Sequence, residues 1–249
     1  MPKAAAGFAG FPPGALAFFA GLREHNDPAW FKPRKPVYDS QVVAPLRELI
    51  AALGPALDAA GLPLRGDPGR AIFRIYRDVR FAADKRLYKT HAGAVLTRSG
   101  GKRDPACSTS TSRPGESMAA AGFWHPEPPL LTQLRRSMLD DPDGFLAMIE
   151  RLAGLGYPVS SDAKLSRPPR GFEAAKGSAV ADYVCWKSFT AHAPLTDAQM
   201  TSPGLVGRIV EFALATRPLL DWGWAAAEDN APPPLTLRMP TRPLPRPDF

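Results

Sequence analysis

Residues 70–91 read RAIFRIYRDVRFAADKRLYKTH, and this stretch carries both the main strand signal and the densest charge of the chain. From residue 71 to residue 81 apolar and polar side chains alternate, the apolar ones being Phe73, Ile75, Val79 and Phe81. A period of two is typical of a strand with one buried face. We therefore predict a strand over residues 71–81, followed by a turn that carries residues 84–89.

Two more strands are expected after this stretch. Residues 91–98 are predicted to form the second strand, and residues 118–124 the third. Between them, Gly100 and Gly101 open a segment rich in serine and threonine. Adjacent glycines and runs of small polar residues are typical of loops, so we expect a polar loop that ends at about Ser117.

Helical periodicity precedes the strands. A first helix is predicted where apolar residues recur at helical spacing behind Pro13, namely Ala15, Phe18, Phe19 and Leu22. A second helix is predicted over residues 36–60, where an apolar stripe has a period near 3.6 and consists of Val42, Leu46, Leu49, Ile50, Leu53 and Leu57. Gly61 is expected to end this helix.

Helical periodicity returns from Glu127 onward, with Leu130, Leu131, Leu134 and Met138 on one face. Asp141 and Pro142 are predicted to be the N-cap and first residue of the next helix. Ser178 and Ser202 are the N-cap candidates of two later helices. The order of helices, then strands, then helices favours an α+β fold, an antiparallel sheet with helices packed mainly on one face.

The chain of 249 residues is long enough for one large domain, which we assign to residues 8–225. Residues 226–249 contain seven prolines from Pro232 onward and are expected to form an extended or disordered tail. Charge-free residues 4–22 are interrupted by Pro12 and Pro13, which argues against a signal peptide or a membrane span. We therefore expect a cytoplasmic protein with no membrane partner; its oligomeric state stays open.

The sequence contains few elements of known catalytic or metal sites. Two cysteines, Cys107 and Cys185, do not make a disulfide framework or a cysteine zinc site. The four histidines His25, His91, His125 and His192 lie far apart, and no phosphate-binding glycine motif is present. We expect no metal and no cofactor. Trp124, His125 and Glu127 are interpreted as the N-terminal cap of the following helix, the alternative being the wall of a site.

The candidate site is the basic stretch itself. In a strand, Arg77 would share a face with apolar side chains, so its guanidinium must be paired or must line a cavity that holds an anion. Arg74 and Arg80 would point the other way, where Asp78 can orient them. The predicted ligand-binding residues are Arg74, Arg77, Asp78, Arg80, Asp84, Lys85, Tyr88 and Lys89.

Four interpretations of this stretch stay open. The cations can form ion pairs that only hold the fold together, or they can bind a phosphate- or carboxylate-bearing small molecule. In an enzyme, Tyr88 or His91 would act as general acid or base on a phosphorylated or sugar-like substrate, with the cations lowering the pKa of Tyr88. The aromatic residues interleaved with the cations also permit nucleic-acid binding, and the net charge of +7 is compatible with it.

The same stretch resembles a family of conserved hypothetical proteins of bacteria and fungi, known as a domain of unknown function. The resemblance rests on the string Arg77, Asp78, Arg80, Phe81, Asp84, Lys85, Tyr88 and Lys89. It extends to Asn26, Trp30, Phe31, Lys35, Tyr38, Gly122, Phe123, Trp124, Pro126, Glu127, Pro169, Arg170, Gly171, Phe172, Lys187, Ser188 and Phe189. Leu87 stands where the family has proline, and residues 104–121 depart from the expected strand. The resemblance implies an α+β domain and brings no established activity.

Overall fold

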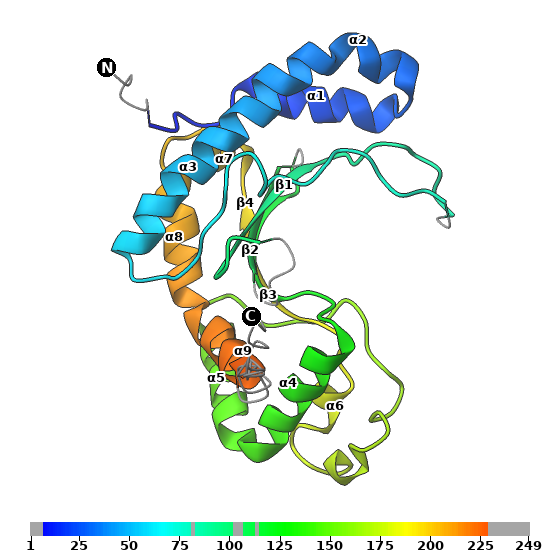
Figure 1. The fold of residues 1–249 in the computed structure, drawn as a ribbon, viewed down its shortest axis with the longest axis vertical. Coiled ribbons are helices and arrows are strands. Elements are labelled where there is room, and N and C mark those ends of the chain that lie inside the picture. The colour runs from blue at the N-terminus through cyan, green and yellow to red at the C-terminus, as the bar shows by residue number, and fades with distance from the viewer. Residues whose placement is uncertain (1–6, 81–82, 102–106, 113–114, 229–249) are drawn as a thin grey trace, which may run out of the picture.

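The computed structural model describes residues 7–80, 83–101, 107–112 and 115–228. Its centre is an antiparallel sheet of four strands in the order β1-β2-β3-β4 (Figure 1). The strands are β1 (Ala92–Thr97), β2 (Cys107–Ser112), β3 (Ser117–Phe123) and β4 (Phe189–Leu195). Strands β1 and β3 confirm the predictions for residues 91–98 and 118–124.

Strand β2 occupies the middle of the segment for which we predicted a polar loop, so that prediction was wrong. It pairs with β1 from Ala92 opposite Ser112 to Thr97 opposite Cys107, and with β3 on its other side. The composition of serine and threonine suggested a loop, but a backbone that is hydrogen-bonded on both sides does not depend on apolar side chains. Threonine is also β-branched and suits an extended backbone.

The strand predicted over residues 71–81 is absent from the described part of that range, and Phe81 lies outside the described residues. Only isolated bridges form, between Ile72 and Ala94 and between Tyr76 and Tyr88. Residues 72–80 and 83–91, called the arm below, leave the edge of β1, fold back on themselves and project from the sheet (Figure 1). The alternation failed to predict a strand because the arm has no continuous neighbouring strand. The arm also lacks a fully buried face, since Phe73, one of the apolar residues of the alternation, is 36% exposed.

The N-terminal helices follow the predicted pattern with one change of boundary. Helix α1 (Pro13–Glu24) buries the four apolar residues expected of it. The second helical run begins at Pro28, not at residue 36, and consists of α2 (Pro28–Tyr38), the π-helical turn η1 (Asp39–Val43) and α3 (Ala44–Ala59). Asp27 sets this start, because its side chain accepts hydrogen bonds from the backbone of Ala29 and Trp30.

The C-terminal half is mostly helical. Its elements are α4 (Pro128–Asp140), α5 (Pro142–Gly154), η2 (Glu173–Ala175), α6 (Ala181–Val184), α7 (Asp197–Met200), α8 (Leu205–Ala215) and α9 (Arg217–Glu228). The Asp141 side chain caps α5 as predicted, by accepting from the Gly144 amide. Ser178 and Ser202 are not N-caps, since α6 and α8 begin three residues later in each case; the Ser202 hydroxyl instead accepts from Gly204 in the preceding turn.

The cap predicted for α4 is confirmed only in its position. Glu127 occupies the N-cap position, but no side chain makes a capping hydrogen bond there. The side chains of Trp124 and His125 bind Asp162 instead, which follows 37 residues after His125. The turn before α4 is therefore part of a tertiary cluster.

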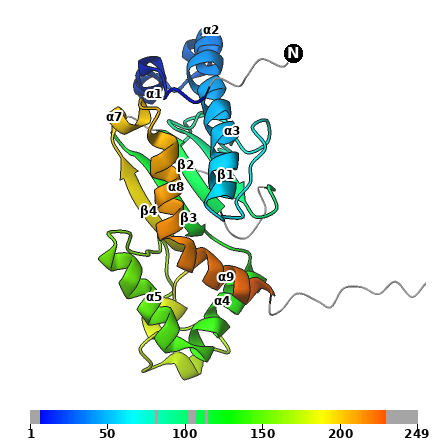
Figure 2. The same cartoon turned by 90° about the vertical axis from the view of Figure 1, so that its left-hand side faces the viewer.

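Helices α3 and α8 cover one face of the sheet (Figures 1 and 2). On β3, the buried Ala119, Ala121 and Phe123 alternate with half-buried Met118 and Ala120. The buried set belongs to the same core as the apolar residues of α3 and α8. This arrangement confirms the predicted α+β class, an antiparallel sheet with helices packed against it.

Helix α9 continues to Glu228, three residues past the domain boundary expected at 225. The predicted proline-rich tail from residue 229 to residue 249 lies outside the described residues. Among the helices that the structure describes, none is both long and apolar enough to cross a membrane.

Candidate functional site

Arg77, the cation expected on a buried face, is held within the arm. Its Nη1 donates to Asp84 Oδ2 at 2.6 Å, and Arg86 Nη2 donates to the same oxygen at 2.8 Å. The side chains of Arg77 and Asp84 are 28% and 38% exposed, so neither is buried. Hydrogen bonds from Arg86, and then from Arg77, hold the pKa of Asp84 far below its usual range. Arg77 and Arg86 therefore both bind Asp84, an acid of the same arm.

A second ion pair lies nearby on the arm. Arg80 donates to both carboxylate oxygens of Asp78, with Nε–Oδ1 and Nη2–Oδ2 distances of 3.0 and 2.7 Å. Arg80 also lowers the pKa of Asp78 through these hydrogen bonds. Lys85 donates to the carbonyl of Val79 at 3.2 Å. Arg80, Asp78 and Lys85, which we predicted as ligand-binding residues, thus make contacts within the arm.

Tyr88 is a packing residue. It is 4% exposed, and its ring stacks on Phe31 of α2 with a centroid distance of 4.3 Å and an interplanar angle of 22°. Asn26 brackets its backbone by donating to the Tyr88 carbonyl and accepting from the Tyr88 amide. Burial raises the pKa of Tyr88, with smaller contributions from Tyr76 and Asp27. The expectation that nearby cations lower this pKa was wrong, because burial raises it and the charged groups that act on Tyr88 are Tyr76 and Asp27, which also raise it.

Two predicted residues, Arg74 and Lys89, line a pocket of about 600 Å³ whose walls come from the arm and from the helical run α2–η1–α3. The lining residues are Phe31, Lys35 and Tyr38 of α2, Asp39 and Val43 of η1, Arg47 of α3, and Gly69, Ile72, Phe73, Arg74, Ile75, Tyr76 and Lys89. His91, the alternative acid or base, does not line this pocket. Within the described residues, the pocket thus unites cations from the arm with cations from the helices.

The pocket contains four cations and a single acid. Lys35 forms an ion pair with Asp39 one helical turn away. Lys89 lies over the Phe73 ring, 5.4 Å from its centroid. Arg47 and Arg74 make no hydrogen bond or ion pair with the residues that the structure describes; Arg74 contributes only to the field that lowers the pKa of Asp78. Two guanidinium groups are therefore available to a ligand.

Aromatic residues form the rest of the pocket wall. Tyr76 is 52% exposed and Phe73 36% exposed, whereas Tyr38 is buried. Burial raises the pKa of Tyr38 to about 12, with further contributions from Asp39 and Tyr76. The Tyr38 hydroxyl therefore keeps its proton at neutral pH.

Lys35 and Arg47 line the pocket but were not among the predicted site residues. Lys35, Asp39, Val43 and Arg47 follow one another at intervals of four, and such a spacing places residues on one face of a helix. This signal was available, but a helix predicted to begin at residue 36 excludes Lys35 from that face. Among the described residues, no group of three or more histidine, cysteine, aspartate or glutamate residues is arranged to hold a metal ion.

The hydrogen bonds from Arg86 and Arg77 predict that the carboxyl group of Asp84 titrates at an unusually low pH. In a variant with both Arg77→Gln and Arg86→Gln, the pKa of Asp84 is expected to rise toward the ordinary aspartate value of about 3.9. Because the folded-state pKa is lowered, the stabilisation that Asp84 provides is present above that ordinary value and is lost as the pH falls below it. Carbon-13 NMR of the carboxyl group against pH measures the change.

Arg80→Gln is the matched control for this titration, since Arg80 binds Asp78 and not Asp84. It should leave the Asp84 titration unchanged. An Asp84 carboxyl that titrates at its ordinary pKa in the unaltered protein would contradict the arrangement.

Comparison with known proteins places the chain in a family. No curated protein and no solved structure matches it. The family of conserved hypothetical proteins DUF2461 matches residues 14–222, which include the sheet, the arm and the pocket. The chain therefore belongs to the DUF2461 family of conserved hypothetical proteins.

Proposed function

We propose that the protein binds a small anionic ligand, one with a phosphate or carboxylate group, in the pocket between the arm and the helical run α2–η1–α3. The observation that carries this proposal is the pair of guanidinium groups of Arg47 and Arg74, which have no partner among the described residues, in a pocket with four cations and one acid. Arginine suits phosphate and carboxylate because its planar fork donates two parallel hydrogen bonds.

The size and lining of the pocket support a small molecule. A volume of about 600 Å³ lies within the usual range of ligand sites. The protonated Tyr38 hydroxyl is a hydrogen-bond donor at neutral pH, and a donor favours an anion. The exposed rings of Phe73 and Tyr76 offer apolar contact to the body of the ligand.

An acid–base role for Tyr88 has less support. A tyrosine that serves as general base at neutral pH needs a lowered pKa, whereas burial raises that of Tyr88. Its ring is also stacked on Phe31 and does not line the pocket. Binding is therefore favoured over catalysis by Tyr88.

Arg74→Ala is the variant that tests the proposal. Calorimetry with inorganic phosphate, a hexose phosphate and succinate should find binding by at least one of these probes to the unaltered protein. Arg74→Ala is then expected to weaken that binding about 10- to 100-fold, since hydrogen bonds to charged groups contribute about 1.5–3 kcal/mol each. Arg47→Ala should have an effect of the same kind.

Arg80→Ala is the control, because it removes the same charge from the same arm but lies outside the pocket. It should leave the affinity nearly unchanged. Equal losses in Arg74→Ala and Arg80→Ala, or affinity for any polyanion that disappears at moderate salt, would contradict a pocket site and favour diffuse attraction of nucleic acid. Absence of binding by all three probes would also contradict it.

A further inference from the structure

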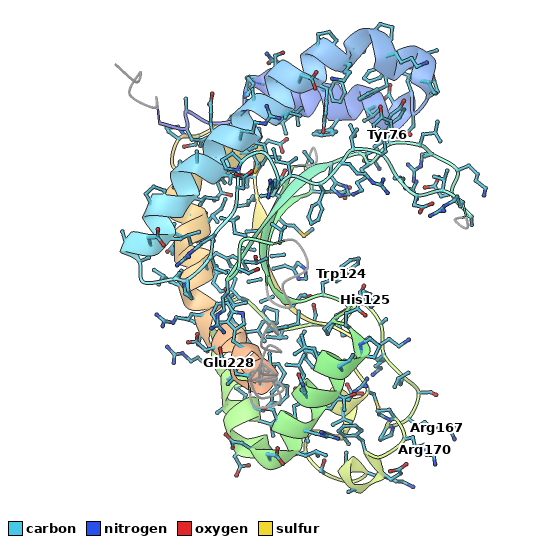
Figure 3. All side chains as sticks on the ribbon, viewed as in Figure 1. Tyr76, Trp124, His125, Arg167, Arg170 and Glu228 are labelled. Carbon is cyan, nitrogen blue, oxygen red and sulfur yellow. The ribbon has the colours of Figure 1, made fainter. Side chains whose placement is uncertain are left out.

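A second cluster of polar and aromatic side chains lies where β3 ends, away from the residues that line the pocket. Asp162 accepts three hydrogen bonds: Trp124 Nε1 donates to Oδ2 at 3.1 Å, His125 Nε2 lies 2.9 Å from the same oxygen, and Ser188 Oγ donates to Oδ1 at 2.8 Å. Trp124 and His125 lie together on the side of the sheet toward which the arm also projects (Figure 3). Three segments of the chain therefore meet at one carboxylate.

The rings of Trp124 and His125 are nearly perpendicular to each other. Their centroids are 4.9 Å apart and the angle between their planes is 83°. Trp124 is nonetheless 67% exposed, the most exposed large apolar side chain of the described residues. An exposed indole whose N–H is bound to a carboxylate presents a flat surface of defined orientation to solvent.

The backbone at His125 is also held in a defined conformation. His125 has a φ of 43°, the only positive φ outside glycine in the part of the chain that the structure describes. Its amide donates to the Oγ of Ser188, a residue that is fully buried. Such a backbone is strained, and strained residues persist where surrounding contacts hold them, often at functional sites.

The hydrogen bonds of Asp162 also determine which ring nitrogen of His125 can accept a hydrogen bond from a ligand. Burial by itself would raise the pKa of Asp162, but hydrogen bonds from Ser188, His125 and Trp124 outweigh it and hold the pKa below its usual value. The carboxylate is thus ionised at neutral pH and accepts from His125 Nε2–H. In neutral His125 the other ring nitrogen, Nδ1, is then an acceptor, and it has no hydrogen-bonding partner among the described residues.

We propose that Trp124 and His125 form a binding platform for a nucleobase, supplied by a nucleotide or by single-stranded nucleic acid. A base offers a planar ring that stacks on the indole and N–H groups at its edge that can donate to His125 Nδ1. The segment that supplies Asp162 also carries Arg167 and Arg170, which are exposed but lie well apart from Trp124 and His125 (Figure 3).

This site is independent of the pocket at the arm, and NMR distinguishes the two. The probes are adenosine, adenosine monophosphate and an eight-residue thymidine oligonucleotide, and the readout is the indole N–H resonance of Trp124, assigned from its loss in Trp124→Phe. We expect this resonance to shift with at least one probe. Trp124→Ala should weaken binding about 5- to 150-fold, the range found for base stacking on an aromatic side chain, while Trp124→Phe, which keeps a ring, should lose less.

The matched control is Tyr76→Ala, which removes another exposed aromatic side chain, one that lines the arm pocket. It should leave nucleobase binding unchanged. Asp162→Asn should weaken binding without touching the ring face, because Asp162 orients both rings. Binding of the oligonucleotide alone would identify nucleic acid as the source, and equal binding of the mononucleotide would identify a small ligand.

Unchanged affinity in Trp124→Ala would overturn the proposal, as would the absence of a shift with all three probes. Equal losses in Tyr76→Ala and Trp124→Ala would also overturn it and assign the probes to the arm pocket. Because Trp124 is exposed, the alanine variant is expected to keep its thermal midpoint, and a change there would be visible in the same samples.

Discussion

Gly122→Ala is expected to lower the free energy of unfolding by about 3–5 kcal/mol. Gly122 lies in β3 opposite Thr190 of β4 and has a φ of 126°. Residues other than glycine avoid this region of φ, at a cost of about 1–3 kcal/mol. An alanine Cβ would also overlap the carbonyl of Phe189 and come within 3.1 Å of Leu219 Cδ2, and overpacking adds a cost of about 1–3 kcal/mol.

Urea unfolding followed by circular dichroism measures this loss. Gly207→Ala is the matched control, since Gly207 lies inside α8 and an added Cβ meets nothing within 4 Å. It should leave stability unchanged or raise it by about 0.5–1 kcal/mol, because alanine has less freedom than glycine in the unfolded chain. A loss below about 1 kcal/mol in Gly122→Ala would contradict the backbone geometry. Gly122 also precedes Trp124 by two residues, so the same variant should displace the rings of Trp124 and His125.

Arg135→Ala is expected to lower the free energy of unfolding by about 2–4 kcal/mol. Arg135 of α4 is 7% exposed, and it donates to the carbonyls of Val184 and Trp186 at 2.7 and 3.0 Å. It thereby joins α4 to the segment that leads into β4. Its removal leaves two carbonyls without this donor, and each lost hydrogen bond to a charged group costs about 1.5–3 kcal/mol, part of which water recovers.

Arg136→Ala is the control for this effect, because Arg136 is the next residue of the same helix and is exposed. Its loss should stay within about 0.5 kcal/mol, as for most surface substitutions. Arg135→Met, which keeps the apolar stem, should recover packing but not the hydrogen bonds. Similar unfolding free energies for Arg135→Ala and Arg136→Ala would contradict the bridging role.

Elements with strong local signals were predictable from the sequence. Helix α1 buries the residues of its apolar stripe, and α5 begins at the predicted Asp141 cap. Both depend on side chains within one or two turns of each other, so the signal and its structural consequence lie in the same short segment. The α+β class followed in turn from the order of these segments along the chain.

Residues 71–81 and strand β2 show where local signals fail. The first has the alternation of a strand and forms only isolated bridges, while the second has the composition of a loop and pairs on both sides. A strand exists only where a neighbouring backbone satisfies its hydrogen bonds, and the neighbour comes from elsewhere in the chain.

The sequence by itself determined helices such as α1 and α5, the two apolar strands β1 and β3, the fold class and the concentration of charge at residues 70–91. Only the tertiary structure decided which charges are available: Arg77 and Arg80 bind acids within the arm, whereas Arg74 lines the same pocket as Arg47 of α3. Only the tertiary structure brought Asp162 to Trp124 and His125. The reason is physical: periodicity and capping act over a few residues, while ion pairing and burial depend on distances in space between segments far apart in the chain.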